Sequence, residues 1–247
     1  MNFNILSGFL LTAALVIIAP LAQAEEQFPT FGDKQTPNYA IENFGAPLGA
    51  MPAGGVRGLH KAALYLIKEF EGWIPDLYND PAGYCTIGYG HLLAKRNCKG
   101  TDRTEFPKAL TLEEGIALLE KDTTGTRLDV QRLVTGTDLT DEQFGALTSF
   151  MFNVGRENFR KSTLLARLND SSADKSTRLK LASREFARWI RAGGQIMSGL
   201  VARRNCEAAL FQGLSVLDKD GNFNRNLCDN LGAMPPTSDT IDIVEGE

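Results

Sequence analysis

The sequence predicts an α+β fold in which one helix is followed by a small β lobe and then by a larger helical lobe. In the first segment, apolar residues recur at helical spacing from Leu59 to Phe70, and the pattern ends at Gly72. In the second segment, residues 73–100, aromatic and β-branched residues alternate with glycine, which is typical of short twisted strands and tight turns. In the third segment, helical spacing returns and continues to Phe211. The order of these patterns places the β lobe directly after the first helix.

Two capping boxes indicate where helices of the third segment begin. In such a box, a Thr side chain and a Glu or Gln three residues later satisfy each other's backbone N–H groups. The boxes are Thr111-Leu112-Glu113-Glu114 and Thr140-Asp141-Glu142-Gln143. The first predicts a helix that runs to about Lys121, and the second predicts an apolar helix that ends at Val154. Helical spacing predicts three more helices, over residues 163–168, 179–191 and 200–211.

The amino-terminal segment is typical of a cleavable secretory signal over residues 1–24. An uncharged and mostly apolar stretch is followed by Ala22-Gln23-Ala24 and then by two glutamates. We therefore expect export to the periplasm or the extracellular space and, with the signal removed, no stable membrane association. The segment lacks a basic residue before the apolar stretch, so an uncleaved signal that tethers the protein to a membrane is the alternative.

Differences in composition divide the chain after the predicted signal into three parts. Residues 25–57 are rich in Pro and Gly without a lasting period, which predicts a linker or extended arm. Residues 58–214 carry the patterned core, and residues 215–247 have an excess of acidic side chains that predicts an acidic tail. The whole chain has a formal net charge of −4, so a nucleic-acid partner is not expected. With 43% hydrophobic and 23% charged residues, disordered and multi-span membrane classes are excluded.

Four cysteines lie beyond the predicted cleavage site. An even number of cysteines in an exported chain predicts two disulfides, for which three pairings are possible. We choose the sequence-local pairing, Cys85 with Cys98 and Cys206 with Cys228. A metal site is not expected, because the sequence has no closely spaced cysteine pair and only two histidines.

Two carboxylates flank the passage from the first helix into the β lobe. Glu71 closes the helix, Asp80 lies in a turn nine residues later, and Thr86 follows on a presumed strand. Glycoside hydrolysis needs such a pair, because one protonated acid serves the leaving oxygen and one ionised partner serves the water or the sugar cation. Spacing alone leaves the choice open, since a helix-terminal Glu and a turn Asp are usually solvated.

The residues around this pair resemble the phage-type lysozymes of glycoside hydrolase family 24, which include the lambdoid and T-even phage endolysins. The first matching motif joins Glu71-Gly72-Trp73 to Tyr78-Asn79-Asp80-Pro81-Ala82-Gly83-Tyr84-Cys85-Thr86-Ile87-Gly88-Tyr89-Gly90-His91. Later matches include Phe152-Asn153-Val154-Gly155 and Gly199-Leu200-Val201-Ala202-Arg203-Arg204. The resemblance covers about residues 58–214 and excludes both flanking segments. The four cysteines are not general to that family.

The resemblance implies a lysozyme-like fold with the active-site cleft between the β lobe and the helical lobe. It implies that residues 58–214 form a catalytic domain, acting as a monomer without a cofactor on bacterial peptidoglycan. The bond cut would be the β-1,4 linkage between N-acetylmuramic acid and N-acetylglucosamine. By position, Glu71 resembles the catalytic acid, Asp80 the second carboxylate and Thr86 the third active-site residue.

Four further residues are expected to bind substrate or to support the site. Tyr89 lies within the glycine-rich run, and His91 matches the family histidine just beyond it. A structural, hydrogen-bonding histidine is an equally good interpretation of His91. Asn153 sits where the family places an amide near the sugar. Arg203 resembles the arginine that pairs with the catalytic glutamate, and a helix-surface salt bridge is its alternative.

The leading hypothesis is therefore an exported muramidase that degrades the cell wall, and the resemblance favours inversion of configuration. A lytic transglycosylase would cut the same bond without water and typically needs one carboxylate. A non-catalytic peptidoglycan-binding protein on the same fold would be expected to lose the carboxylates. The presence of Asp80 and Thr86 beside Glu71 favours hydrolysis over both alternatives.

Overall fold

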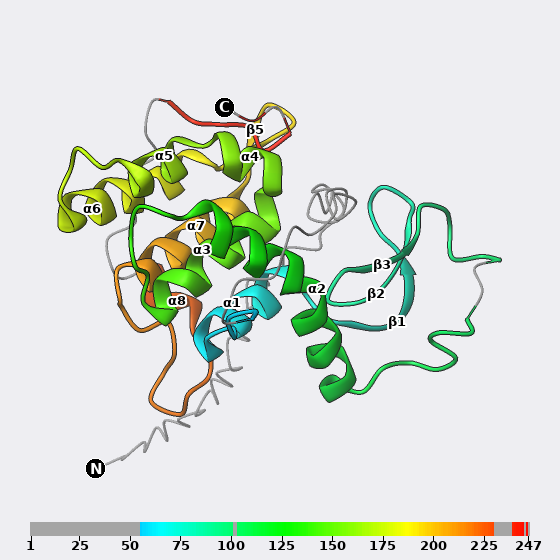
Figure 1. The fold of residues 1–247 in the computed structure, drawn as a ribbon. Coiled ribbons are helices and arrows are strands. Elements are labelled where there is room, and N and C mark those ends of the chain that lie inside the picture. The colour runs from blue at the N-terminus through cyan, green and yellow to red at the C-terminus, as the bar shows by residue number, and fades with distance from the viewer. Residues whose placement is uncertain (1–54, 101–102, 230–238, 245, 247) are drawn as a thin grey trace, which may run out of the picture.

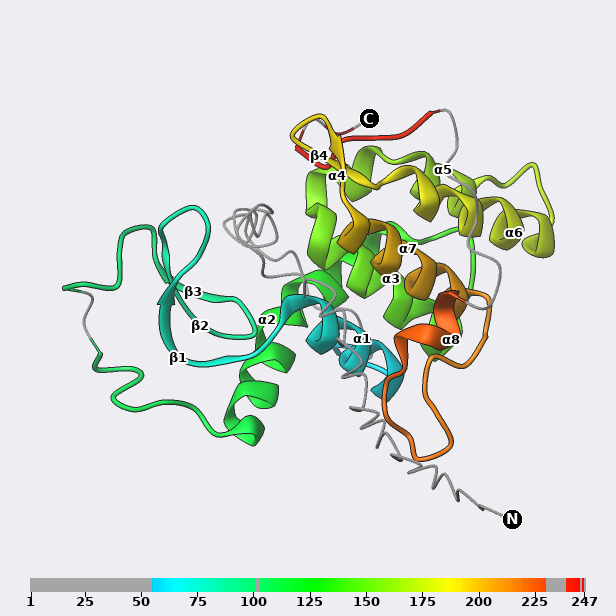
Figure 2. The ribbon, with the colours of Figure 1, turned by 180° about the vertical axis from the view of Figure 1, so that it is seen from behind.

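A computed structural model describes residues 55–100, 103–229, 239–244 and 246, and Figures 1 and 2 show it from two opposite sides. The predicted signal and nearly all of the predicted arm lie outside the described residues. The first helix, α1 (Lys61–Glu71), is followed by a three-stranded antiparallel sheet and then by the helices of a larger lobe. This order confirms the predicted α+β fold with a β lobe after the first helix.

The β lobe is a small sheet with the strand order β1-β2-β3. Its strands are β1 (Ile74–Asn79), β2 (Cys85–Gly88) and β3 (His91–Ala94). Tyr78 on β1 pairs with Thr86 on β2, and Ile87 on β2 pairs with His91 on β3. The turn between β2 and β3 is tight because Gly90 adopts a φ of 86°, which only glycine adopts readily. In Figure 1 the lobe stands to one side of the helices.

Helix α2 (Leu112–Leu133) runs between the two lobes in both views (Figures 1 and 2). It begins at the predicted capping box, in which the Thr111 hydroxyl accepts from the Glu114 backbone N–H. The predicted end near Lys121 is wrong by three turns. The helix continues through Gly125 because its second half buries Leu128 and Val130, and no Pro interrupts it before Val134.

The helical lobe surrounds α3 (Asp141–Val154), which begins at the second capping box and ends at Val154 as predicted. Around it lie α4 (Arg156–Lys161), α5 (Thr163–Asn169), α6 (Lys175–Glu185), α7 (Ser198–Phe211) and α8 (Arg225–Asp229). The helix predicted over residues 179–191 ends earlier, at Glu185. A 3-10 turn and the short hairpin β4 (Arg191–Ala192) and β5 (Gln195–Ile196) follow instead. The chain turns there because Trp189 enters the core, where its ring contacts Phe150 with centroids 5.6 Å apart.

The described residues after position 214, which are 215–229, 239–244 and 246, pack onto the helical lobe rather than projecting from it. Val216 and Cys228 are buried in the same core cluster as α3, and so are Ile241 and Ile243 near the end of the chain. The Arg191 backbone N–H donates to the Ile241 carbonyl at 3.2 Å, which joins the chain end to β4. The acidic residues of this segment therefore sit on a backbone that helps to close the core.

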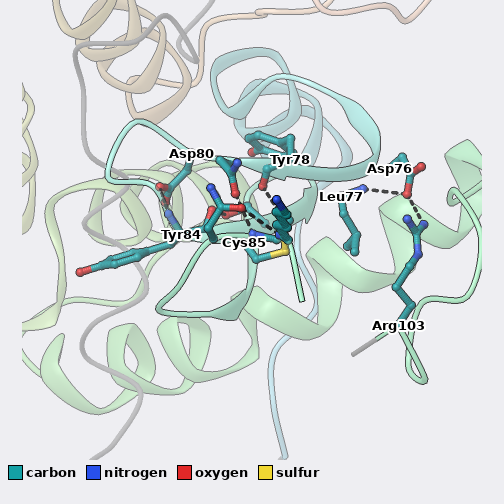
Figure 3. Close-up of a disulfide and its surroundings, with 12 residues drawn as sticks. Asp76, Leu77, Tyr78, Asp80, Tyr84, Cys85 and Arg103 are labelled. Carbon is teal, nitrogen blue, oxygen red and sulfur yellow. Dashed lines mark hydrogen bonds and ion pairs between the residues drawn. A yellow bond between two sulfur atoms is a disulfide. The ribbon is translucent and has the colours of Figure 1, made fainter. Parts of the chain in front are cut away.

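Both disulfides have the sequence-local pairing, Cys85–Cys98 and Cys206–Cys228. The first lies within the β lobe, next to the turn that carries Asp80 (Figure 3). The second joins α7 to α8 in the helical lobe. Each bond therefore closes a loop inside one lobe.

A close approach between the lobes depends on Gly115 in the first turn of α2. A Cβ at this position would overlap the indole ring of Trp73, which also packs against Tyr89 with ring centroids 4.8 Å apart. We expect Gly115→Ala to displace the indole and to lower the free energy of unfolding by about 1–3 kcal/mol, partly offset by about 1 kcal/mol of helix propensity. Thermal unfolding followed by tryptophan fluorescence measures this. Gly58→Ala is the control, because a Cβ at Gly58 would meet no atom within 4 Å.

Candidate active site

Helix α1 delivers Glu71 to the inner side of the helical lobe as its last residue. The helix ends there because Gly72 takes a φ of 73° and donates its N–H to the Lys68 carbonyl at 3.2 Å. The Glu71 side chain is only 5% exposed. Arg203 on α7 donates from Nη1 to Glu71 Oε1 at 2.7 Å. Glu71 is therefore a buried carboxylate held by one charged hydrogen bond, as the predicted arginine partner requires.

Arg203 belongs to a buried charged network between α3 and α7. Its Nε donates to Glu207 Oε1 at 3.0 Å, and Arg204 donates from Nη1 to Glu207 Oε2. The Ser149 hydroxyl donates to Glu207 Oε1 at 2.6 Å. Burial alone would lower the pKa of Arg203, but the charges of Glu71 and Glu207 outweigh burial and raise it. Two guanidinium groups and two carboxylates thus share one interior, and the surface salt bridge considered for Arg203 is wrong.

Asn153, near the end of α3, is also part of this network. Its amide oxygen accepts a hydrogen bond from Arg204 Nη2, and the residue is buried. Burial lowers the pKa of Arg204, although the Glu207 carboxylate acts against that effect. The structure thus places Asn153 where it holds an arginine of the network.

Asp80 lies in the turn between β1 and β2 and is fixed by that turn (Figure 3). The Tyr84 backbone N–H donates to Asp80 Oδ1 at 2.8 Å, and the Asp80 N–H donates to the Tyr84 carbonyl at 2.9 Å. Gly83 donates its N–H to the Asp80 carbonyl at 2.9 Å. These bonds involve only one side-chain oxygen, so the turn orients the carboxylate and leaves Oδ2 for other contacts.

Tyr78 on β1 connects Glu71 and Asp80 electrostatically. Burial raises the pKa of its phenol to about 12, and the negative charges of Glu71 and Asp80 both add to that rise. The two carboxylates, which come from different elements, therefore act on the same side chain. We did not select Tyr78 as a site residue from the sequence. The sequence signal that could have identified it is its position two residues before Asp80 in the motif that matches the family.

Thr86 is the cross-strand neighbour of Tyr78 and is almost fully buried. Its hydroxyl donates to the Tyr84 carbonyl at 3.2 Å. Through this bond and the Tyr78 pairing, Thr86 is joined to the same turn that orients Asp80. The β1–β2 hairpin thus brings together Tyr78, Asp80 and Thr86.

The two remaining predicted residues make contacts elsewhere in the β lobe. His91 Nδ1 lies 2.9 Å from Asp122 Oδ2, which ties β3 to α2 and matches the structural interpretation of this histidine. The Tyr89 ring packs on Trp73, and the Lys68 ammonium lies 5.8 Å from its centroid. Within the described residues, no three His, Cys, Asp or Glu side chains are grouped to hold a metal ion.

The raised pKa of Tyr78 predicts a loss of stability at alkaline pH. Because the folded state holds the phenol proton more tightly than the unfolded chain, this stabilisation is complete below pH 10 and is lost as the pH rises toward about 12. We expect Tyr78→Phe to lose less stability than the wild type across this window, by on the order of 1–2 kcal/mol. Urea unfolding at several pH values measures the difference. Equal losses in the two proteins would contradict the raised pKa of Tyr78.

Comparison with known proteins identifies the family of this chain. The family described as phage lysozyme matches residues 68–207. An endolysin of Bacillus phage B103 is 37% identical over 161 residues, which cover 62% of this chain and 53% of the endolysin. The chain thus spans about half the length of the first curated relatives that it matches.

Solved structures show the same fold. The muramidase domain of SpmX from Asticaccaulis excentricus has a TM-score of 0.52 and 34% identity, covering 63% of this chain and 98% of that domain. A variant of the lysozyme of phage P22 has a TM-score of 0.53 and 28% identity, covering 63% of this chain and 99% of that protein. The predicted lysozyme-like fold is confirmed, and the chain belongs to the phage lysozyme family.

Proposed function

We propose that this protein is an exported muramidase, which hydrolyses the β-1,4 bond between N-acetylmuramic acid and N-acetylglucosamine in peptidoglycan. The observation that carries the proposal is the buried Glu71 carboxylate, held by Arg203 at 2.7 Å, together with the Asp80 carboxylate fixed in the turn of the following hairpin. A buried carboxyl at the end of α1 and a second one in the polar turn of the next hairpin fit the acid and the ionised partner of glycoside hydrolysis.

In this mechanism Glu71 protonates the oxygen of the leaving sugar as general acid. Arg203 binds Glu71 Oε1, so it orients the carboxyl and leaves Oε2 for the proton transfer. The Asp80 carboxylate, fixed in its turn, stabilises the oxocarbenium-like transition state and accepts the proton that the attacking water loses as it bonds to the anomeric carbon. The Thr86 hydroxyl already donates to Tyr84, so its oxygen is left to accept a hydrogen bond from the attacking water.

Several further assignments belong to the same proposal. We infer a signal over residues 1–24, an arm over residues 25–57, a catalytic domain over residues 58–214 and a monomeric enzyme. The two disulfides support export, because such bonds form and persist in oxidising compartments. Within the described residues, no helix is long and apolar enough to cross a bilayer.

Digestion of purified peptidoglycan, with mass analysis of the released ends, tests the reaction. A muramidase releases reducing muramic acid, while a lytic transglycosylase releases 1,6-anhydro ends and a non-catalytic binder releases nothing. We expect reducing ends, and an α-configured first product if the reaction inverts. Inversion requires a water between carboxyl groups about 6.5–9.5 Å apart. A β-configured first product would contradict inversion while leaving hydrolysis intact.

A further inference from the structure

A cavity of about 480 Å³ lies against α1, on a face that does not carry Glu71. Four lining residues come from α1 and its C-terminal cap, namely Tyr65 and the residues three, four and seven positions after it, Lys68, Glu69 and Gly72. Residues at this spacing share one side of a helix. Glu71 falls between the last two positions and projects from another side, where Arg203 binds it. The cavity is therefore distinct from the proposed catalytic carboxylate.

The outer wall of this cavity comes from the segment between α7 and α8. Asn222 and Phe223 form it, and both lie outside residues 68–207, the part that matches the family. Phe223 is held by an edge contact with the buried Phe70, with ring centroids 6.3 Å apart. The cavity is thus built partly from residues beyond the shared family core.

The cavity is lined by one cationic side chain, Lys68, and one anionic side chain, Glu69. The Lys68 ammonium lies 4.8 Å from the Tyr65 ring centroid and 5.8 Å from that of Tyr89. No carboxylate of the described residues lies within ion-pair distance of this ammonium. Glu69 also lines the cavity, but Arg225 already donates to its Oε1 at 3.0 Å. Lys68 is therefore the charged group that remains for a ligand.

Aromatic side chains make up much of the remaining lining. Trp73, Tyr89, Tyr65 and Phe223 present rings, of which Trp73 and Tyr89 pack on each other. Flat aromatic faces receive the apolar side of a sugar ring, and an ammonium binds a carboxylate as a point charge. The combination fits a sugar that bears a carboxylate.

We propose that this cavity binds a muropeptide unit of peptidoglycan, a sugar whose peptide substituent carries carboxylates, outside the catalytic cleft. The choice of ligand rests on the proposed function. Binding at a second site would hold the enzyme on its polymeric substrate between cleavage events, because a second contact raises the effective concentration of the first. Short uncharged substrates would not use the cavity.

Fluorescence titration tests this inference directly. The chain has two tryptophans, and Trp189 is fully buried while Trp73 lines the cavity, so Trp73 is the reporter. A Glu71→Gln parent is titrated with the anionic disaccharide-tetrapeptide and, separately, with neutral chitotetraose. We expect Lys68→Met to weaken the binding of the muropeptide by about fivefold, as for a partly exposed charge pair, and to leave the binding of chitotetraose unchanged.

Two further variants make the result decisive. Phe223→Ala removes the wall and is expected to weaken muropeptide binding without touching a charge. Lys175→Met, an exposed position at the start of α6, is the matched charge control and is expected to bind like the parent. Equal muropeptide affinity in the parent, Lys68→Met and Phe223→Ala would overturn the proposal. These titrations need no turnover, whereas failure of the wild type to release reducing ends would contradict the proposed function itself.

Discussion

Glu71→Gln is expected to abolish peptidoglycan hydrolysis while preserving the fold. The amide keeps an oxygen that can accept the 2.7 Å hydrogen bond from Arg203, so the network stays occupied. It has no acidic proton to give to the leaving oxygen, and removing a general acid costs about 10²–10⁴-fold in rate. Release of reducing ends from purified peptidoglycan measures the loss, and circular dichroism shows that the protein is folded.

Glu69→Gln is the matched control for this result. Glu69 lies on the same helix and also pairs with an arginine, Arg225, but its side chain is 41% exposed. We expect hydrolysis of a short soluble glycan by this variant to remain within about twofold of the wild type, since exposed ion pairs contribute little. A Glu71→Gln protein that still degrades peptidoglycan at a near-normal rate would overturn the assignment of the acid.

Glu207→Gln is expected to cause the largest loss of stability. Glu207 is completely buried and accepts hydrogen bonds from Arg203, Arg204 and Ser149. The neutral amide of Gln would leave Glu71 as the one carboxylate that balances the two buried guanidinium groups of this network. Removing one partner of a buried ion pair in this way lowers the free energy of unfolding by about 3–5 kcal/mol. For a protein of this size the expected fall in Tm is roughly 10 °C. Calorimetry measures it.

The comparison for Glu207 is Glu157→Gln on α4. Glu157 also pairs with an arginine, Arg160 at 2.8 Å, but both side chains are nearly half exposed. We expect this variant to change the free energy of unfolding by at most about 0.5 kcal/mol. If Glu157→Gln and Glu207→Gln had similar effects, the interior network would not contribute to stability as described.

Features of the fold that depend on neighbouring residues were predicted well from the sequence. Features that depend on contacts between distant residues were not. The capping boxes at Thr111 and Thr140 place helix starts correctly, because both partners of each box lie within four residues. The end of α2 could not be read locally, since it is set by the burial of Val130 in another lobe. The turn at Trp189 likewise depends on Phe150, which lies far away in the sequence.

The site follows the same division. Glu71 and Asp80 lie in one motif, so the resemblance predicted both of them as site residues. Tyr78 lies in the same motif but was not predicted as a site residue. Glu207 was missed because its partners come from α3 and α7, and Ser149 is 58 positions away. A buried glutamate four residues after an arginine on one helix reads in sequence as an ordinary surface pair. Only the packing of the two helices shows that it is interior.

The positions of the disulfides have a consequence for motion between the lobes. Cys85–Cys98 strengthens the β lobe and Cys206–Cys228 the helical lobe, but neither bond crosses from one to the other. Between them run α2 and the chain around Gly72, which are not cross-linked by either bond. Each disulfide thus stabilises its own lobe against unfolding, and neither cross-links the two lobes to each other. Relative movement of the two lobes is therefore opposed by non-covalent contacts, such as the packing of Trp73 on Gly115 and the pairing of His91 with Asp122, rather than by a covalent bond.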